Sequence, residues 1–63
     1  MTKYVIKNKA NPPAYWTGWG YPNMEPLFEA DKPEDAFKFL AATEASIYGL
    51  ERLEMDFEVV ATT

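Results

Sequence analysis

The chain has 63 residues, a formal net charge of −4, and neither cysteine nor histidine. Without cysteine it has no disulfides, thiolate metal sites or thiol nucleophiles. Without histidine it lacks the commonest general base and the commonest metal ligand. The acidic balance argues against direct nucleic-acid binding, which requires Lys and Arg to neutralise phosphates. These exclusions favour a binding protein without a cofactor over an enzyme.

The length indicates one domain, residues 1–63. Such a chain buries only about 60% of its unfolded surface, so its stability is marginal and a homodimer would strengthen it. Apolar residues make up 48% of the chain and supply a core. No stretch has the length and apolar character of a membrane span or a signal peptide, so we expect a cytoplasmic protein with no membrane partner.

The N-terminal half predicts two strands and a short third one. Residues Lys3–Lys7 are β-branched and aromatic, with Tyr4 and Ile6 on one face. After a proline-containing loop, Tyr15–Gly20 predicts a second strand antiparallel to the first, weakened by its glycines. Leu27–Ala30 predicts a short third strand.

The middle of the chain predicts a helix from Asp31 to Tyr48. Asp31 and Glu34 form a capping-box pattern with a proline between them, and Gly49 suits the position just after the helix. The helical period gathers one apolar face, which we expect to be buried: Ala36, Phe39, Leu40, Thr43 and Ile47. The opposite side, expected to face water or a partner, contains Lys38, Ala42, Ala45 and Ser46.

The C-terminal segment, residues 51–61, alternates as a strand with one wet face. Its apolar positions, expected to face the helix, are Leu53, Met55, Phe57 and Val59. The alternate positions are Arg52, Glu54, Asp56 and Glu58. The predicted fold class is therefore α+β, with the order β-β-(β)-α-β and a small antiparallel-rich sheet crossed by one helix.

Glu54, Asp56 and Glu58 form the first candidate site. On a strand, their carboxylates would stand about 6.6–6.8 Å apart in a row. Such a row is a solvated face, a surface for Lys and Arg of a protein partner, or, less readily, a metal site. The sequence predicts no metal.

An aromatic segment forms the second candidate site, with Tyr15, Trp16, Trp19 and Tyr21 within seven residues. One strand of so small a domain cannot bury all four rings, so we expect at least one exposed tryptophan. The segment could belong to the core, anchor a protein interface as Trp and Tyr often do, or stack a nucleobase. No phosphate-binding motif accompanies it. Catalysis by a carboxylate pair would need a cleft that a one-helix domain can hardly form, so we predict no catalytic residues.

The opening strand, the tryptophan-containing second strand and the Phe-Glu-Ala-Asp-Lys-Pro-Glu-Asp-Ala entry to the helix resemble small ββαβ proteins encoded by bacteriophages and prophages. The residues that carry the resemblance are Tyr4, Val5, Ile6, Trp19, Phe28 and Ala36. It implies a protein that binds, and so blocks or redirects, a host macromolecule.

The leading hypothesis is thus a phage-type accessory protein that binds a host protein with a basic surface. Its protein-binding residues would be Glu54, Asp56, Glu58, Trp16, Trp19, Tyr15 and Tyr21. Two alternatives stay open. One is an oligomeric protein that sequesters a nucleotide-like ligand on the aromatic segment, and the other is a structural homodimer without a ligand.

Overall fold

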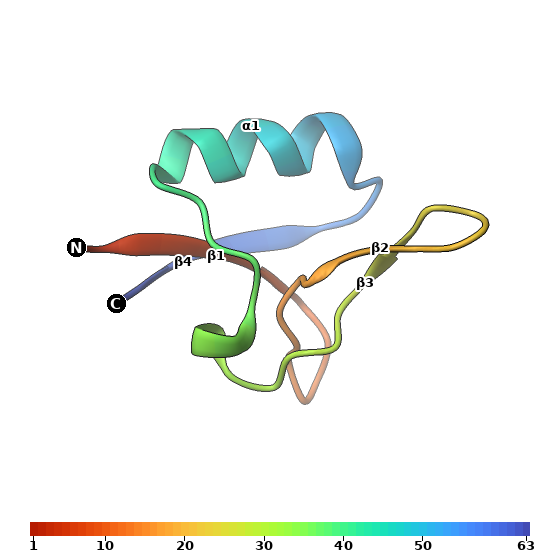
Figure 1. Ribbon diagram of the computed structural model, residues 1–63, viewed down its shortest axis with the longest axis horizontal. Helices are drawn as coiled ribbons and strands as arrows, with labels where there is room; N and C mark the ends of the chain where they lie inside the picture. Colours follow the sequence, from red (N-terminus) through yellow and green to blue (C-terminus); the bar gives the residue numbers. More distant parts are fainter.

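The computed structural model describes residues 1–63 and is of the predicted α+β class, with two antiparallel strand pairs and one α-helix (Figure 1). The elements in chain order are β1 (Lys3–Asn8), β2 (Gly18–Gly20), β3 (Glu25–Leu27), the 3-10 helix η1 (Pro33–Asp35), α1 (Ala42–Arg52) and β4 (Phe57–Thr62). The first and last strands pair with each other, which brings the two ends of the chain together.

The β1–β4 pair is the centre of the fold. Val5 lies opposite Val60 and Ile6 lies opposite Val59, and both β1 residues are fully buried. Successive side chains of a strand point to opposite faces, so the two residues fill different layers. Ile6 joins the larger core cluster, to which α1 contributes. Tyr4 packs against the same cluster, which confirms the prediction that Tyr4 and Ile6 share one face. Val5 packs with Ala30 and Ala36 on the other face.

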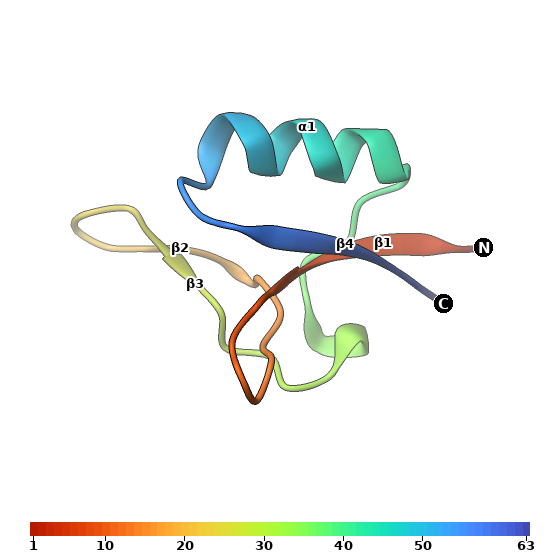
Figure 2. The same cartoon turned by 180° about the vertical axis from the view of Figure 1, so that it is seen from behind.

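Figures 1 and 2 show α1 on one side of this pair and the segment around η1 on the other. The β2–β3 hairpin extends from the end of the sheet that lies beyond the C-terminal end of α1. The sheet is therefore covered on both faces, although only one of its covers is an α-helix.

The prediction that Tyr15–Gly20 forms a strand paired with β1 along its length is wrong. Only its start lies against β1: Tyr15 is bridged to Lys7, and the Trp16 N–H donates to the Ile6 carbonyl at 2.8 Å. At Gly18 the backbone has φ of 149°, which glycine adopts readily, and the chain leaves the sheet to form β2. β2 pairs with β3, which starts two residues before the predicted third strand.

The predicted helix from Asp31 to Tyr48 is also wrong at both ends. Residues 33–35 form only a 3-10 turn, and no side chain caps it. Residues 36–41 are not helical, and Phe39 exchanges two backbone hydrogen bonds with Tyr4, of 2.9 and 2.7 Å. This pairing closes one edge of β1 and buries Phe39, so a tertiary contact overrides the local helical pattern.

Because α1 begins late, its buried face differs from the predicted one. Leu40, Thr43 and Ile47 are exposed, whereas Ala45 and Gly49 are buried. Gly49 does not end the helix, which continues to Arg52. A Cβ at Gly49 would lie 2.6 Å from Cε2 of Phe57, so the missing side chain lets the ring of β4 pack directly on the helix backbone.

The predicted strand over residues 51–61 starts six residues late, at Phe57. Leu53 is buried, but as the residue that follows α1, and its N–H donates to the Gly49 carbonyl. Phe57 and Val59 pack against the cluster to which α1 contributes, which confirms their predicted facing. Met55 lies in the connection and is exposed instead of buried.

Candidate protein-binding site

The three predicted acidic residues are all exposed, but they do not form a row on one strand. Glu54 and Asp56 lie in the connection between α1 and β4, and only Glu58 lies on β4. The sequence alternates here because Leu53, just after α1, is buried and Phe57 begins β4, although the residues between them belong to neither element. The acids therefore follow a bend in the chain.

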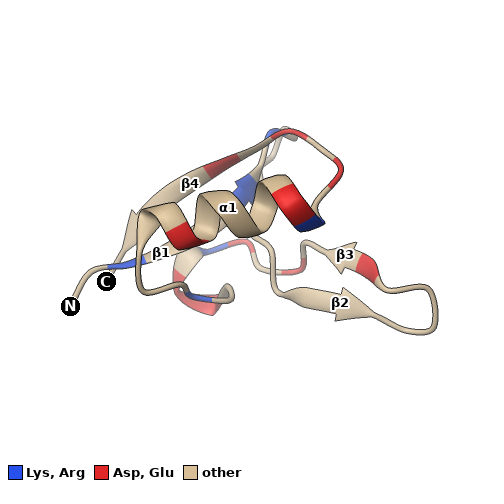
Figure 3. Cartoon of the chain, turned by 90° about the horizontal axis from the view of Figure 1, so that it is seen from above, with Lys and Arg blue, Asp and Glu red and all other residues tan.

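These acids nevertheless gather at one end of the molecule, where α1 passes into β4 (Figure 3). Together with Glu51 they make four acidic residues between positions 51 and 58, against one basic residue, Arg52. The guanidinium carbon of Arg52 lies 5.5 Å from the centre of the Tyr48 ring. Glu58 forms an ion pair with Lys7, with 3.6 Å between its Oε2 and the Lys7 Nζ, and Lys9 lines the same surface pocket. Both side chains are partly exposed, so this ion pair is weak. We call Glu51, Glu54, Asp56 and Glu58 the acidic end.

No group of acidic side chains is arranged so that it could hold a metal ion. Neither helix has the length and apolar character needed to cross a membrane.

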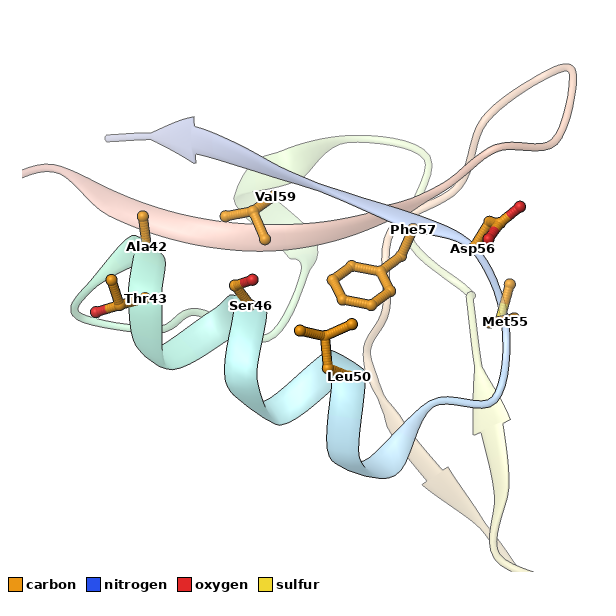
Figure 4. Close-up of a pocket in the computed structure, with 8 residues that line it drawn as sticks. All are labelled: Ala42, Thr43, Ser46, Leu50, Met55, Asp56, Phe57 and Val59. Carbon is orange, nitrogen blue, oxygen red and sulfur yellow. The ribbon is translucent and has the colours of Figure 1, made fainter.

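Beside the acidic end, a groove of about 570 Å³ runs between α1 and β4 (Figure 4). Its helix side is formed by Ala42, Thr43, Ser46 and Leu50, and its strand side by Met55, Asp56, Phe57 and Val59. Leu50 is 74% exposed at this site, a large apolar side chain facing solvent. Asp56 is the only charged residue that lines the groove. The surface thus combines a largely apolar groove with one carboxylate in its wall, Asp56, and the other residues of the acidic end lie outside the groove.

The aromatic segment mostly serves the core. Trp16 is only 2% exposed and packs against the rings of Trp19, Phe37, Phe39 and Tyr48, with ring centres 5.2–6.1 Å apart. Its Nε1 is buried without a hydrogen-bond partner. The structure therefore places Trp16 inside, where no partner can reach its face.

Trp19 is the tryptophan that stays partly exposed, and its ring also faces the core. Its Nε1 donates to the Tyr48 hydroxyl at 2.9 Å. The turn in the backbone at Gly18 breaks the alternation that would have put Trp16 and Trp19 on opposite faces. Tyr15 packs partly buried in the smaller core cluster, whereas Tyr21, at the start of the β2–β3 turn, is 91% exposed.

Of the predicted site residues, the structure brings Glu54, Asp56 and Glu58 to one end, and it leaves Tyr21 on a separate, exposed turn. Sequence reasoning missed the groove and Leu50. A signal was present, since Ala42, Ser46 and Leu50 recur every four residues and the first two were expected to face water or a partner.

We compared the chain with known proteins at three levels. It matches no protein-family model, no curated protein sequence and no solved structure.

Proposed function

We propose that the chain is a phage-type accessory protein that binds a host protein through a basic surface of that protein, and in doing so inhibits or redirects it. The acidic end carries this proposal. Four carboxylates lie within eight residues beside a single arginine, next to an exposed leucine and an exposed methionine. Acidic side chains around an apolar surface suit a partner with Lys and Arg around an apolar contact.

The aromatic segment supports this function less directly than the acidic end does. Trp16 is buried, and the Nε1 of Trp19 is already engaged by Tyr48. A nucleotide-like ligand would need a free ring face, and Tyr21 alone offers one that is largely exposed. Protein binding at the acidic end is therefore the favoured function over ligand sequestration.

The test is affinity capture from a bacterial lysate with the immobilised chain. A Glu54→Lys/Glu58→Lys variant changes the net charge from −4 to 0 and should lose the captured protein. The matched control, Glu34→Lys/Asp35→Lys, makes the same charge change at exposed positions of η1, on the side of the β1–β4 pair opposite α1, and should retain it. Equal capture by both variants would overturn the acidic end as the binding site.

A further inference from the structure

The outer edge of β4 is unpaired along its whole length. β4 pairs only with β1, and the order of that sheet contains no third strand. In an antiparallel pair, residues alternate between those whose backbone groups point to the partner strand and those whose groups point away. The alternation on β4 can be fixed from β1.

Tyr4, Ile6 and Asn8 direct their backbone groups away from β4. Tyr4 bonds Phe39, Ile6 accepts from Trp16, and Asn8 donates to Ala14. Their partners across the ladder are Ala61, Val59 and Phe57, respectively. These three β4 residues must therefore direct their N–H and C=O groups away from β1, to the open edge. No hydrogen bond reaches those groups from elsewhere in the chain.

The two faces of this edge differ in chemistry. On the α1 side, the groove offers small and apolar side chains and no charge except Asp56 at its end. Phe57 and Val59 point to this side. On the other face, Glu58 is exposed. A strand added here would meet an apolar surface with one set of side chains and a carboxylate with the other.

We propose that β4 accepts an extended segment of the partner protein as an added antiparallel strand, with apolar side chains in the groove and Lys or Arg side chains toward Glu58 and the acidic end. This inference rests on the proposed function and specifies its mode. Backbone hydrogen bonds supply affinity in such strand addition, and alternate side chains supply specificity. The antiparallel direction is the more stable pairing per residue.

Charge complementarity selects a basic segment over a second copy of this chain. Two copies paired edge to edge would bring together molecules that each carry −4, so neither copy would supply a surplus of Lys and Arg to the acidic end of the other. A segment with Lys or Arg at alternate positions would instead neutralise these acids.

The probe is a synthetic peptide with Val and Lys alternating over six residues, the length of β4. It should bind, and a peptide with Val and Glu alternating should bind at least about tenfold more weakly. In the proposed register, the N–H groups of the peptide's Val residues donate to β4, and those of its Lys residues point to solvent. N-methylation of the Val amides should abolish binding, whereas N-methylation of the Lys amides should leave it unchanged.

Protein variants test the groove with the same peptide. Leu50→Ser should weaken binding about tenfold through lost apolar contact. Leu40→Ser is the matched control, since Leu40 is 67% exposed but does not line the groove, and it should have no effect. In a peptide titration followed by amide exchange, the N–H groups of Phe57, Val59 and Ala61 should become protected.

Several outcomes would overturn the inference. No binding of the Val/Lys peptide, equal effects of the two N-methylated peptides, or equal effects of the two leucine variants would each do so. Protection of the edge amides that rises with protein concentration alone would assign the edge to a second copy. Failure of the proposed function is recognised separately, because it is judged by charge-reversed capture from the lysate. If capture is lost in the Glu54→Lys/Glu58→Lys variant but is unchanged in an Ala61→Pro variant, the proposed function holds and strand addition is overturned.

Discussion

The two outer edges of the β1–β4 pair are treated in opposite ways. The edge of β1 is closed by the chain itself, through the segments that contain Trp16 and Phe39. The edge of β4 has no such cover. Open edges of sheets are usually protected by Lys, Pro or a bulge. β4 reads Phe-Glu-Val-Val-Ala-Thr, with one charge and no proline. The chain thus uses its aromatic residues on one edge and leaves the other edge able to pair.

Removing the aromatic cover from the edge of β1 should have the largest effect on stability. Trp16→Ala deletes the ring that contacts four others and should lower the free energy of unfolding by about 3–5 kcal/mol. This is most of the stability of a small domain, so chemical denaturation followed by circular dichroism should show a largely unfolded chain. Tyr21→Ala, at an exposed ring, should change stability by less than about 0.5 kcal/mol. A folded, stable Trp16→Ala variant would contradict the role of this cluster.

Proline placed on either side of β4 tests the register. Val60→Pro removes an N–H that points to β1, together with a side chain of the smaller core cluster, and should cost on the order of 2–3 kcal/mol. Ala61→Pro removes an N–H that points to the open edge and should cost less than about 1 kcal/mol. Denaturation midpoints of the two variants, measured side by side, check the difference. Equal losses would mean that the outward direction assigned to Ala61 is wrong.

On the α1 side of β4, Gly49 lies directly against the Phe57 ring. Gly49→Ala introduces a methyl group against the Phe57 ring and should cost about 1–3 kcal/mol from overpacking, partly offset by the better helix propensity of alanine. Phe57→Leu in the same chain should relieve the clash, so the double variant should be more stable than the sum of the two single changes predicts. Additive single and double effects in thermal unfolding would show that the two residues are not in contact.

The hydrogen bond between Trp19 and Tyr48 should make a smaller contribution to stability. Tyr48→Phe removes the acceptor of the Trp19 Nε1 and should cost about 0.5–1.5 kcal/mol while leaving the ring packing intact. Tyr15→Phe is the control, because no hydrogen bond involves the Tyr15 hydroxyl, and its stability should be unchanged. Urea denaturation monitored by tryptophan fluorescence measures both. Equal stabilities of the two variants would assign no energetic role to this bond.

The sequence predicts the elements whose contacts are local or strictly alternating. The first strand and the facing of Phe57 and Val59 follow from a period of two. The segment from Ala36 to Ala41 could not be predicted in the same way. Its helical pattern is real, but the two hydrogen bonds between Phe39 and Tyr4 join residues far apart in the chain.

The candidate site was partly predictable for the same reason. Glu54, Asp56 and Glu58 are exposed near one another, as their charge indicates, but their placement on one strand depended on where α1 ends. The groove has walls from two elements, and its helix wall becomes recognisable only once α1 continues past Gly49 to Arg52, which places Leu50 on the helix. The packing of Trp16 and Trp19 against each other depends on the positive φ at Gly18, which no alternating pattern anticipates.

The open edge of β4 is most directly tested by amide hydrogen exchange in the free protein at a concentration where its solution mass is that of a monomer. The structure predicts slow exchange at Glu58 and Val60, whose N–H groups point to β1, and fast exchange at Val59 and Ala61, whose N–H groups point outward. Uniformly slow exchange across these four residues in the monomer would mean that the outer edge is covered and would contradict its availability to a partner strand.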